Sequence, residues 1–336
     1  MIESFLLASV VLCAFLTGVL RHYALSRNLL DLPNHRSSHS VPTPRGGGVA
    51  IVLTTLIGIA ALTSVGDVSL PLCMAMVLGG GAVALVGFLD DHGHIAARVR
   101  LLIHFISAAV ILLLLSGLAP IQVGPIAITS LILRNTFAIL YLVWLLNLFN
   151  FMDGIDGIAS VQVVTTCASA SLLFYLSGNH ALISATLLLA SATFGFFIWN
   201  FPPAKIFMGD AGSGFIGIAI GVLSIASSWE APAYFWAWCI LLGVFIVDAS
   251  YTLMRRLLGG AKIYEAHRSH AYQIAARRFG AHLPVTIVVG LINVFWLLPL
   301  AASVVLLGLN GALGALIAYS PLLAIAVSCN AGSDRT

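Results

Sequence analysis

The chain has 336 residues, of which 60% are hydrophobic and only 8% are charged, and its formal net charge is +3. Soluble domains carry about 25% charged residues, so this composition excludes an ordinary soluble globule and predicts a protein that lies largely in a bilayer. The five cysteines fall in apolar stretches and form no CxxC pair. This pattern argues against a disulfide framework or a cysteine metal site.

Eleven stretches are long and apolar enough to predict membrane-spanning helices, since about 20 apolar residues cross the hydrocarbon core. In chain order they are 3–25, 46–64, 69–89, 99–118, 135–151, 158–177, 180–199, 212–228, 233–254, 284–308 and 311–329. The first stretch follows no basic segment and precedes no obvious cleavage site, so we expect it to be a retained helix. We therefore expect an all-α integral membrane protein, in which residues 1–336 form one bundle of about 11 transmembrane helices.

The positive charges predict which side of the membrane each loop faces. With the N-terminus outside, the inner segments are 26–45, 90–98, 152–157, 200–211, 255–283 and the C-terminal tail. All of the 15 lysines and arginines except Arg134 lie in or beside these segments. Because positive charge in short loops is retained in the cytoplasm, we expect these segments to be cytoplasmic. The same charges would attract anionic membrane lipid.

Five carboxylates from three separate loops share that predicted face, and they are Asp90, Asp91, Asp153, Asp156 and Asp210. A helix bundle can bring such loops together. A carboxylate beside hydrocarbon is costly unless it is paired or binds a cation, so these residues are candidates for a functional site.

The stretch NLFNFMDGIDG, residues 147–157, places Asn147, Asn150, Asp153 and Asp156 three residues apart. On a helix each residue lies about 60° round from the last, so neighbours share one face. The pattern predicts a strip of oxygen ligands and amide donors where a helix meets the cytoplasm. A solvated helix end with turn residues is the alternative interpretation.

Two further acidic motifs indicate metal and phosphate chemistry. Asp90 and Asp91 stand side by side, and such charges repel unless a divalent cation or a shared proton relieves them; a plain helix-terminal turn is the alternative. Asp210 precedes a glycine-rich run that opens a helix, where free N–H groups suit a phosphate. Mg²⁺ takes one or two carboxylates together with phosphate oxygens. Phe207 offers a ring for a base to stack on, or is an aromatic residue of the membrane interface.

Two polar inner loops supply basic residues. In the fifth, His267 and His270 stand three apart among arginines, which fits pyrophosphate binding better than zinc, because no further zinc ligand is evident. In the first, His39 and Arg45 are candidate substrate contacts or parts of a basic turn that flanks the membrane. Asp248 lies inside the ninth stretch, and we expect it to pair with a basic side chain or another helix in a structural role.

Five motifs together resemble the polyprenyl-phosphate N-acetylhexosamine-1-phosphate transferases. They are PTPRGGG, LDD, NLFNFMDGIDGIA, FMGDAGS and HRSHAYQ, in this order between residue 33 and about residue 280. The resemblance implies a bundle with a cleft at the cytoplasmic face of the bacterial inner membrane. It also implies transfer of a sugar-1-phosphate from a UDP-sugar to undecaprenyl phosphate, with release of UMP and with Mg²⁺ or Mn²⁺ as cofactor. No nucleic-acid partner is expected, and a homodimer is left open.

The same resemblance assigns roles to individual residues. It implies Asp210 as the metal ligand, and Asp90 and Asp91 as catalytic residues beside the attacking phosphate. It implies that the nucleotide faces Asn150, Asp153 and Asp156, that uracil stacks on Phe207, and that Arg268 and His270 begin a histidine motif. With the candidates of the first loop, the substrate-binding residues expected are His39, Arg45, Asn150, Asp153, Asp156, Phe207, Arg268 and His270.

The sugar is less well indicated. Relatives carry further histidines where this chain has Tyr272 and Gln273. The chain looks most like the branch that initiates O-antigen synthesis and accepts deoxy-amino sugars such as N-acetylfucosamine or N-acetylquinovosamine.

Other functions fit parts of the pattern. A secondary transporter also has many spans with polar residues inside the membrane, although here the carboxylates gather at one face. A CDP-alcohol phosphotransferase shares Asp-Gly signatures, but DGIDGIAS lacks the expected arginine, and a scaffold for polysaccharide assembly is a third alternative. For the transferase, direct attack by the lipid phosphate and an aspartyl-phosphate intermediate both remain open.

Overall fold

The structure is a computed structural model and describes residues 2–33, 39, 41–93, 95–261 and 267–333. Arg36, Lys262 and Arg335, three of the basic residues used to predict orientation, lie outside this part of the chain. Within it, nine helical segments are apolar and long enough to cross a membrane. They are α1 (Ile2–Ser26), α3 (Leu70–Met74) with η1 (Ala75–Gly80) and α4 (Gly81–His92), α5 (Ala97–Leu114), α6 (Leu131–Met152), α7 (Ile158–Leu176), α8 (Ile183–Asn200), α9 (Asp210–Ser228), α13 (Leu283–Ile292) with η2 (Asn293–Leu297) and α14 (Leu298–Leu306), and α15 (Gly311–Ser328).

The other two predicted spans are helical but irregular. The ninth is broken into α10 (Pro232–Leu241) and α11 (Gly243–Leu258), whose axes differ by 68°. The second is α2 (Val49–Ser64), whose 16 residues extend about 24 Å, less than the ~30 Å of a hydrocarbon core. The all-α membrane bundle is thus confirmed, and all eleven stretches are helical, but two of them are not plain spans.

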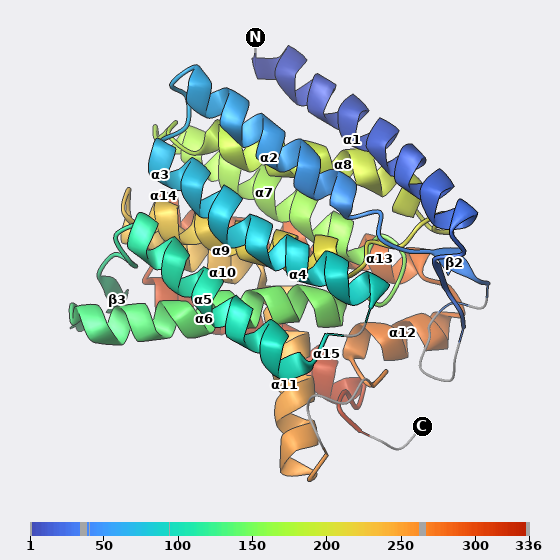
Figure 1. Cartoon of the computed structure of the whole chain (residues 1–336). Coiled ribbons are helices and arrows are strands. Elements are labelled where there is room, and N and C mark those ends of the chain that lie inside the picture. The colour runs from blue at the N-terminus through green and yellow to red at the C-terminus, as the bar shows by residue number, and fades with distance from the viewer. Residues whose placement is uncertain (1, 34–38, 40, 94, 262–266, 334–336) are drawn as a thin grey trace.

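The helices form one tilted bundle, as Figure 1 shows. In it α1 and α2 pack on α8, α8 packs on α7, and α4 and α6 pack on α9. The lower part of α11 projects from the bundle beside the short helix α12 (Ala271–Phe279) and the C-terminal end of the described chain (Figure 1). The ends of α4 and α8 and the starts of α2 and α9 meet on the same side as α12, which is where the polar loops gather.

Helix α9 lies inside the bundle, because nearly all of its residues are covered by other helices. Glycines allow the close packing. A Cβ on Gly217 would lie 2.6 Å from the Leu145 carbonyl oxygen of α6, and a Cβ on Gly87 of α4 would lie 2.6 Å from the Asp210 carbonyl oxygen. Only glycine permits such backbone contact, and the contact at Gly87 brings the end of α4 against the start of α9.

The break between α10 and α11 is stabilised from a distant helix. The Leu241 carbonyl oxygen accepts a hydrogen bond from Gln162 Nε2 at 2.9 Å and one from Thr166 Oγ1 at 3.2 Å. Asn293, at the start of η2, donates to Gln162 Oε1 at 3.1 Å. Backbone groups that a helix break releases inside a membrane must find such partners, so this buried cluster stabilises the bend.

Gln162→Leu should therefore lower the apparent melting temperature in detergent by about 2–6 °C, since an unpaired buried polar group costs about 1–3 kcal/mol. Thermal unfolding followed by circular dichroism measures the change. The matched control is Gln122→Leu in the exposed strand β3 (Ile121–Val123), which should melt within about 1 °C of the wild type. Equal melting temperatures for the two variants would show that Gln162 does not stabilise the break.

Two short hairpins complete the fold. Strand β3 pairs with β4 (Ile126–Ile128) in antiparallel register, with Gln122 opposite Ala127. Strand β1 (Leu30–Asp31) pairs with β2 (Thr43–Pro44), with Leu30 opposite Pro44. The second hairpin matters for the site, because Phe207 N donates to the Pro44 carbonyl at 2.8 Å and so fastens the first polar loop to the segment that precedes α9.

Candidate active site

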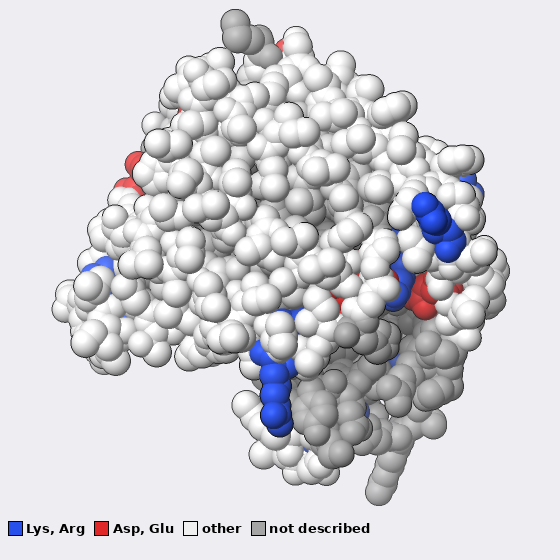
Figure 2. All heavy atoms as spheres, viewed as in Figure 1, with Lys and Arg blue, Asp and Glu red and all other residues white. Residues whose placement is uncertain are grey.

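A cavity of about 420 Å³ opens where α4, α6 and α9 meet the polar loops, and we call it the acidic cavity. Eight of the residues predicted from the sequence line it, and they are His39, Arg45, Asp91, Asn150, Asp153, Asp156, Phe207 and Asp210. Figure 2 shows acidic side chains grouped beside basic ones on this side of a surface that is mostly uncharged. The structure therefore brings Asp91 and Asp210, which are 119 positions apart in the sequence, into one cavity.

Asp91 caps the start of α9. Its Oδ1 accepts the Asp210 N–H and its Oδ2 accepts the Ala211 N–H, both at 3.3 Å. Gly209 precedes them with a φ of +79°, and a Cβ there would lie 2.7 Å from Asp91 Oδ2, so glycine is required. The prediction that free N–H groups at this terminus receive a phosphate is wrong for these two N–H groups, because a carboxylate already occupies them.

Asp90 has different surroundings from its neighbour. Its Oδ1 accepts the Ile95 N–H at 2.8 Å, and its Oδ2 is bound by the Arg100 guanidinium. Asp90 does not line the acidic cavity. The expected repulsion between the adjacent carboxylates is thus relieved by Arg100 and by the α9 terminus, and of the two predicted catalytic aspartates only Asp91 faces the cavity.

The DGIDG loop closes another side of the acidic cavity. Helix α6 ends at Met152, so the predicted strip does not continue on a helix: Asp153 is the first residue after it and Asp156 lies in the loop. Burial and the nearby charges of Asp156 and Asp210 raise the pKa of the Asp153 carboxyl well above its usual value. Asp153 therefore lies buried beside two other carboxylates in this cavity.

Asp156 is held by contacts from two other segments. Its Oδ2 accepts the Ala204 N–H at 3.0 Å and lies 3.1 Å from His282 Nδ1. Thr286 Oγ1 donates to the Asp156 carbonyl at 2.9 Å. These bonds connect the loop to the start of α13 and to the segment before α9, so Asp156 positions the loop as well as lining the cavity.

His39 and Phe207 form another part of the wall of the acidic cavity. Their ring centroids are 4.8 Å apart in an edge-to-face arrangement, and His39 Nε2 lies 3.3 Å from the Asp31 carbonyl oxygen. Arg45 donates from Nη2 to the Asp91 carbonyl oxygen at 2.6 Å. The first polar loop therefore contacts the LDD motif through Arg45 and the FMGDAGS motif through His39. These contacts place both candidate substrate-binding residues at the acidic cavity.

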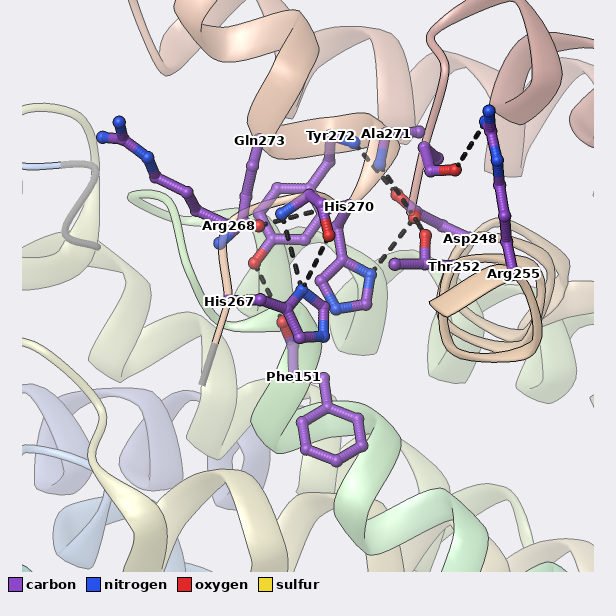
Figure 3. A network of polar contacts seen from close by, with 12 residues as sticks. Phe151, Asp248, Thr252, Arg255, His267, Arg268, His270, Ala271, Tyr272 and Gln273 are labelled. Atoms are coloured by element: carbon purple, nitrogen blue, oxygen red, sulfur yellow. Dashed lines mark hydrogen bonds and ion pairs between the residues drawn. The ribbon is translucent and has the colours of Figure 1, made fainter. Parts of the chain in front are cut away.

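A second cavity of about 490 Å³, which we call the adjoining cavity, shares Asn150 and Asp210 with the acidic cavity. His270 lines it, and Figure 3 shows this histidine inside a network of polar contacts centred on Asp248. Asp248 accepts N–H bonds from Ala271 and Tyr272, both at 2.9 Å, and lies 3.3 Å from His270 Nδ1. The structural role expected for Asp248 is confirmed, since it fixes both the start of α12 and the His270 ring.

Tyr272 and Arg268 flank His270 in the HRSHAYQ motif. The buried Tyr272 hydroxyl donates to the Phe151 carbonyl at 2.9 Å, and burial together with the charges of Asp248 and Asp153 raises its pKa well above the usual value. Arg268 points away from His270 (Figure 3) and lines neither cavity. The structure thus brings His270 to the site but does not bring Arg268 there.

Several residues of the site carry no signal in the sequence. The acidic cavity is also lined by Asp31, Asn200 and His282, and the adjoining cavity by Arg100. Arg100 contributes to the charge count alone, and the others stand singly outside the acidic motifs. Only the tertiary packing of the loops reveals them.

The donor set fits a hard divalent cation. Among the described residues, no group of three or more His, Cys, Asp or Glu side chains forms a ready metal cage. Mg²⁺ does not need one, because it commonly takes one or two carboxylates and completes its shell with phosphate oxygens and water. Burial first, and then the nearby charges of Asp156 and Asp210, raise the pKa of Asp153, and a bound cation would favour the ionised carboxylate in these surroundings.

Comparison with known proteins gives a consistent result. Residues 73–228 match the family model of glycosyl transferase family 4. The chain is 26% identical over 79% of its length to a probable undecaprenyl-phosphate N-acetylglucosaminyl 1-phosphate transferase of Bacillus subtilis, covering 75% of that protein. It is also 26% identical, over 87% of its length and 88% of the relative, to an undecaprenyl-phosphate α-N-acetylglucosaminyl 1-phosphate transferase of Thermotoga maritima.

A third relative is a phospho-N-acetylmuramoyl-pentapeptide-transferase of Streptococcus pneumoniae, with 26% identity over 71% of this chain and 76% of the relative. The matched region of the family model contains α4, α6 and the start of α9, which supply Asp91, Asn150 and Asp210 to the acidic cavity. The chain is thus similar to glycosyl transferase family 4 over residues 73–228, and over most of its length to transferases of N-acetylglucosaminyl 1-phosphate that are named for undecaprenyl phosphate.

Proposed function

We propose that this protein transfers a sugar-1-phosphate from a UDP-sugar to undecaprenyl phosphate, giving undecaprenyl-diphosphate-sugar and UMP. The observation on which this proposal rests is the pair of cavities that meet at Asp210 and Asn150. One is acidic and polar, as a metal-bound pyrophosphate requires. The other combines polar side chains with apolar ones, as a lipid phosphate requires.

The donor fits the acidic cavity. Phe207 offers a ring to the base, and a third cavity of about 560 Å³ adjoins on the far side of Phe207 and Asp156. The acceptor phosphate fits the adjoining cavity, where Arg100, Asn150 and His270 surround it and Leu101 and Leu146 contribute apolar wall. The two phosphates would then meet beside Asp210.

In the proposed reaction, an oxygen of the lipid phosphate attacks the β-phosphorus of the UDP-sugar. The bond from that phosphorus to the oxygen that bridges the two phosphates breaks, and UMP leaves with the electron pair. Both substrates are anions, so positioning and charge stabilisation supply most of the rate. Here Arg45 and Arg100 supply positive charge, and the capped start of α9 holds Asp210 in place.

We propose Mg²⁺, or Mn²⁺ in its place, as the cofactor, held by Asp210 with Asp153 and Asn150 nearby. When bound, it would neutralise phosphate charge and favour departure of UMP. The proposal is supported by the grouping of Asp153, Asp156 and Asp210 with Asn150 in one cavity, because these side chains offer the oxygen ligands that Mg²⁺ prefers.

Metal affinity should rise with pH. Because the pKa of Asp153 is raised, its carboxyl is protonated at low pH, and a cation that needs the carboxylate must displace that proton. The apparent Kd for Mn²⁺, measured by electron paramagnetic resonance on the purified protein, should fall by up to about tenfold per pH unit below that pKa. Asp153→Asn should flatten the dependence, and an unchanged slope in this variant would contradict the assignment.

For the donor, we propose UDP-N-acetylhexosamine or a deoxy derivative of it, in a reaction that initiates O-antigen or another cell-envelope glycan. The third cavity supports a donor with apolar groups, because Pro202, Pro203, Ala276 and Leu283 line it. We also propose that the protein lies in the bacterial inner membrane with this site facing the cytoplasm, which the distribution of basic residues supports.

The test is a membrane assay with undecaprenyl phosphate and a panel of UDP-sugars, in which UMP and the lipid-linked product are both measured. We expect equal amounts of both products, with one sugar preferred, and no UMP without the lipid. Accumulation of a phosphorylated enzyme before lipid is added would replace direct attack with a two-step route. Uptake of UDP-sugar or another solute into proteoliposomes without UMP release would instead favour a transporter.

A further inference from the structure

Arg100, at the N-terminal end of α5, lies between two of the carboxylates discussed above. Its Nη1 binds Asp90 Oδ2, and the same nitrogen lies 3.3 Å from Asp210 Oδ2. One guanidinium therefore connects the end of α4 to the start of α9. Its side chain is 33% exposed and lines the adjoining cavity, so it can change its partners without disturbing the packing of the bundle.

The two carboxylates hold Arg100 unequally. Asp90 is 15% exposed, is fixed by the Ile95 N–H, and does not line the acidic cavity. Asp210 is 33% exposed, borders both cavities, and makes the longer contact with Arg100. Asp90 is thus a permanent anchor for Arg100, whereas Asp210 is a partner that another cation can take over.

We propose that Arg100 is a positioning residue that exchanges partners during the reaction, an inference that rests on the function proposed above. Before substrates bind, its guanidinium neutralises Asp210. When a divalent cation binds Asp210, the guanidinium is repelled from that carboxylate, keeps Asp90, and directs its remaining N–H groups to the acceptor phosphate in the adjoining cavity. The planar donor fork of arginine suits a carboxylate on one edge and a phosphate on another.

This exchange links the two substrates. Metal binding at the donor site would release the group that binds the acceptor, so the lipid phosphate would bind best to the metal-loaded protein. It also gives Asp90 a role without contact to substrate, namely holding Arg100 beside the adjoining cavity. Removal of Arg100 should strengthen metal binding, because Asp210 loses a competing partner, and should weaken binding of the lipid phosphate. A purely structural role would not produce two effects of opposite sign.

The experiment compares Arg100→Gln with Arg98→Gln. Arg98 lies on the same helix turn, is exposed, and makes no ion pair with a described residue, so the control removes equal charge nearby. Mn²⁺ binding is measured by electron paramagnetic resonance without substrates, and KM values for undecaprenyl phosphate and UDP-sugar are measured separately. Arg100→Gln should bind Mn²⁺ about two- to fivefold tighter, because a partly exposed competing ion pair is lost.

The same variant should raise KM for undecaprenyl phosphate about tenfold or more, as the loss of a charge-assisted hydrogen bond implies, and should leave KM for UDP-sugar within about twofold. Arg98→Gln should match the wild type in all three measurements. Unchanged or weaker Mn²⁺ binding, or an equal rise in both KM values, would overturn the proposal.

If Arg100→Gln does not fold, Arg100→Lys carries the kinetic test. A lysine keeps the charge but lacks the fork, so KM for the lipid should rise alone, and equal changes in both KM values would overturn the proposal. Failure of this proposal can be told apart from failure of the proposed function, because Mn²⁺ binding is measured without turnover. A wild-type protein that releases no UMP would refute the transferase assignment whatever the variants bind.

Discussion

Asp210→Asn should reduce metal-dependent UMP release by about 10²–10³-fold or more while the protein still folds in the membrane. Asp210 borders both cavities and is the point at which the two proposed substrates meet. Asparagine preserves the shape and the main-chain N–H that Asp91 accepts, but removes the negative charge that a divalent cation requires. The measurement is UMP release against Mg²⁺ concentration in membranes with equal amounts of protein.

The control for this variant is Asp67→Asn, which removes one carboxylate from an exposed position between α2 and α3. It should leave turnover within about twofold of the wild type. If Asp210→Asn retained near-normal, metal-dependent activity, Asp210 would not be the metal ligand, and the ion would have to be placed elsewhere in the cavity.

Asp91→Asn and Asp90→Asn should differ strongly, although the two residues are adjacent. In the first variant, an amide replaces a carboxylate that accepts two N–H bonds at the start of α9. At most one of these can be kept without rotation, because half of the amide is a donor. The misplacement of Asp210 that follows should lower kcat by about 10²-fold or more.

Asp90→Asn should lower kcat less, by about tenfold, because Asp90 lines neither cavity and acts through Arg100. Its main effect should be on KM for the lipid. The measurements are kcat and the KM values for undecaprenyl phosphate and UDP-sugar, made on the two purified variants. Equal losses of kcat would contradict the separate placement of the two side chains and would favour direct contact of both with the attacking phosphate.

The helices were predictable because apolar length alone defines them. The break at Leu241 was not, since α10 and α11 contain no proline at the bend, and the partner of the Leu241 carbonyl is Gln162 on α7. The short α2 could not be separated from a full span either. Gly46 to Gly48, just before α2, are apolar enough to be counted as part of a span. In the structure they belong to a loop whose geometry is fixed by contact with Met208.

The site was predictable where acidic residues recur in short motifs. Asn150, Asp153 and Asp210 line the acidic cavity as the motifs indicate. The sequence does not show in which direction each of these side chains points. Adjacent residues on a helix point about 100° apart, and nothing local shows that Asp90 turns to Arg100 while Asp91 turns to α9.

The remaining differences are matters of long-range packing. His282 is 126 positions from Asp156 and follows no motif, yet its Nδ1 lies 3.1 Å from that carboxylate. Arg268 stands two residues before His270 in the sequence, but its side chain points away from the histidine (Figure 3). Charge patterns show that basic residues are near; only the folded loops show which of them reach the cavities.

The most direct test of the central claim is the location of the metal and donor in the folded protein. Crystals grown with Mn²⁺ and a UDP-sugar would show the ion by its anomalous scattering. We predict one peak in the acidic cavity, contacting Asp210 and the pyrophosphate, with the base beside Phe207. A peak at the opposite end of the helices, or a nucleotide bound away from Asp153 and Asp210, would contradict the account.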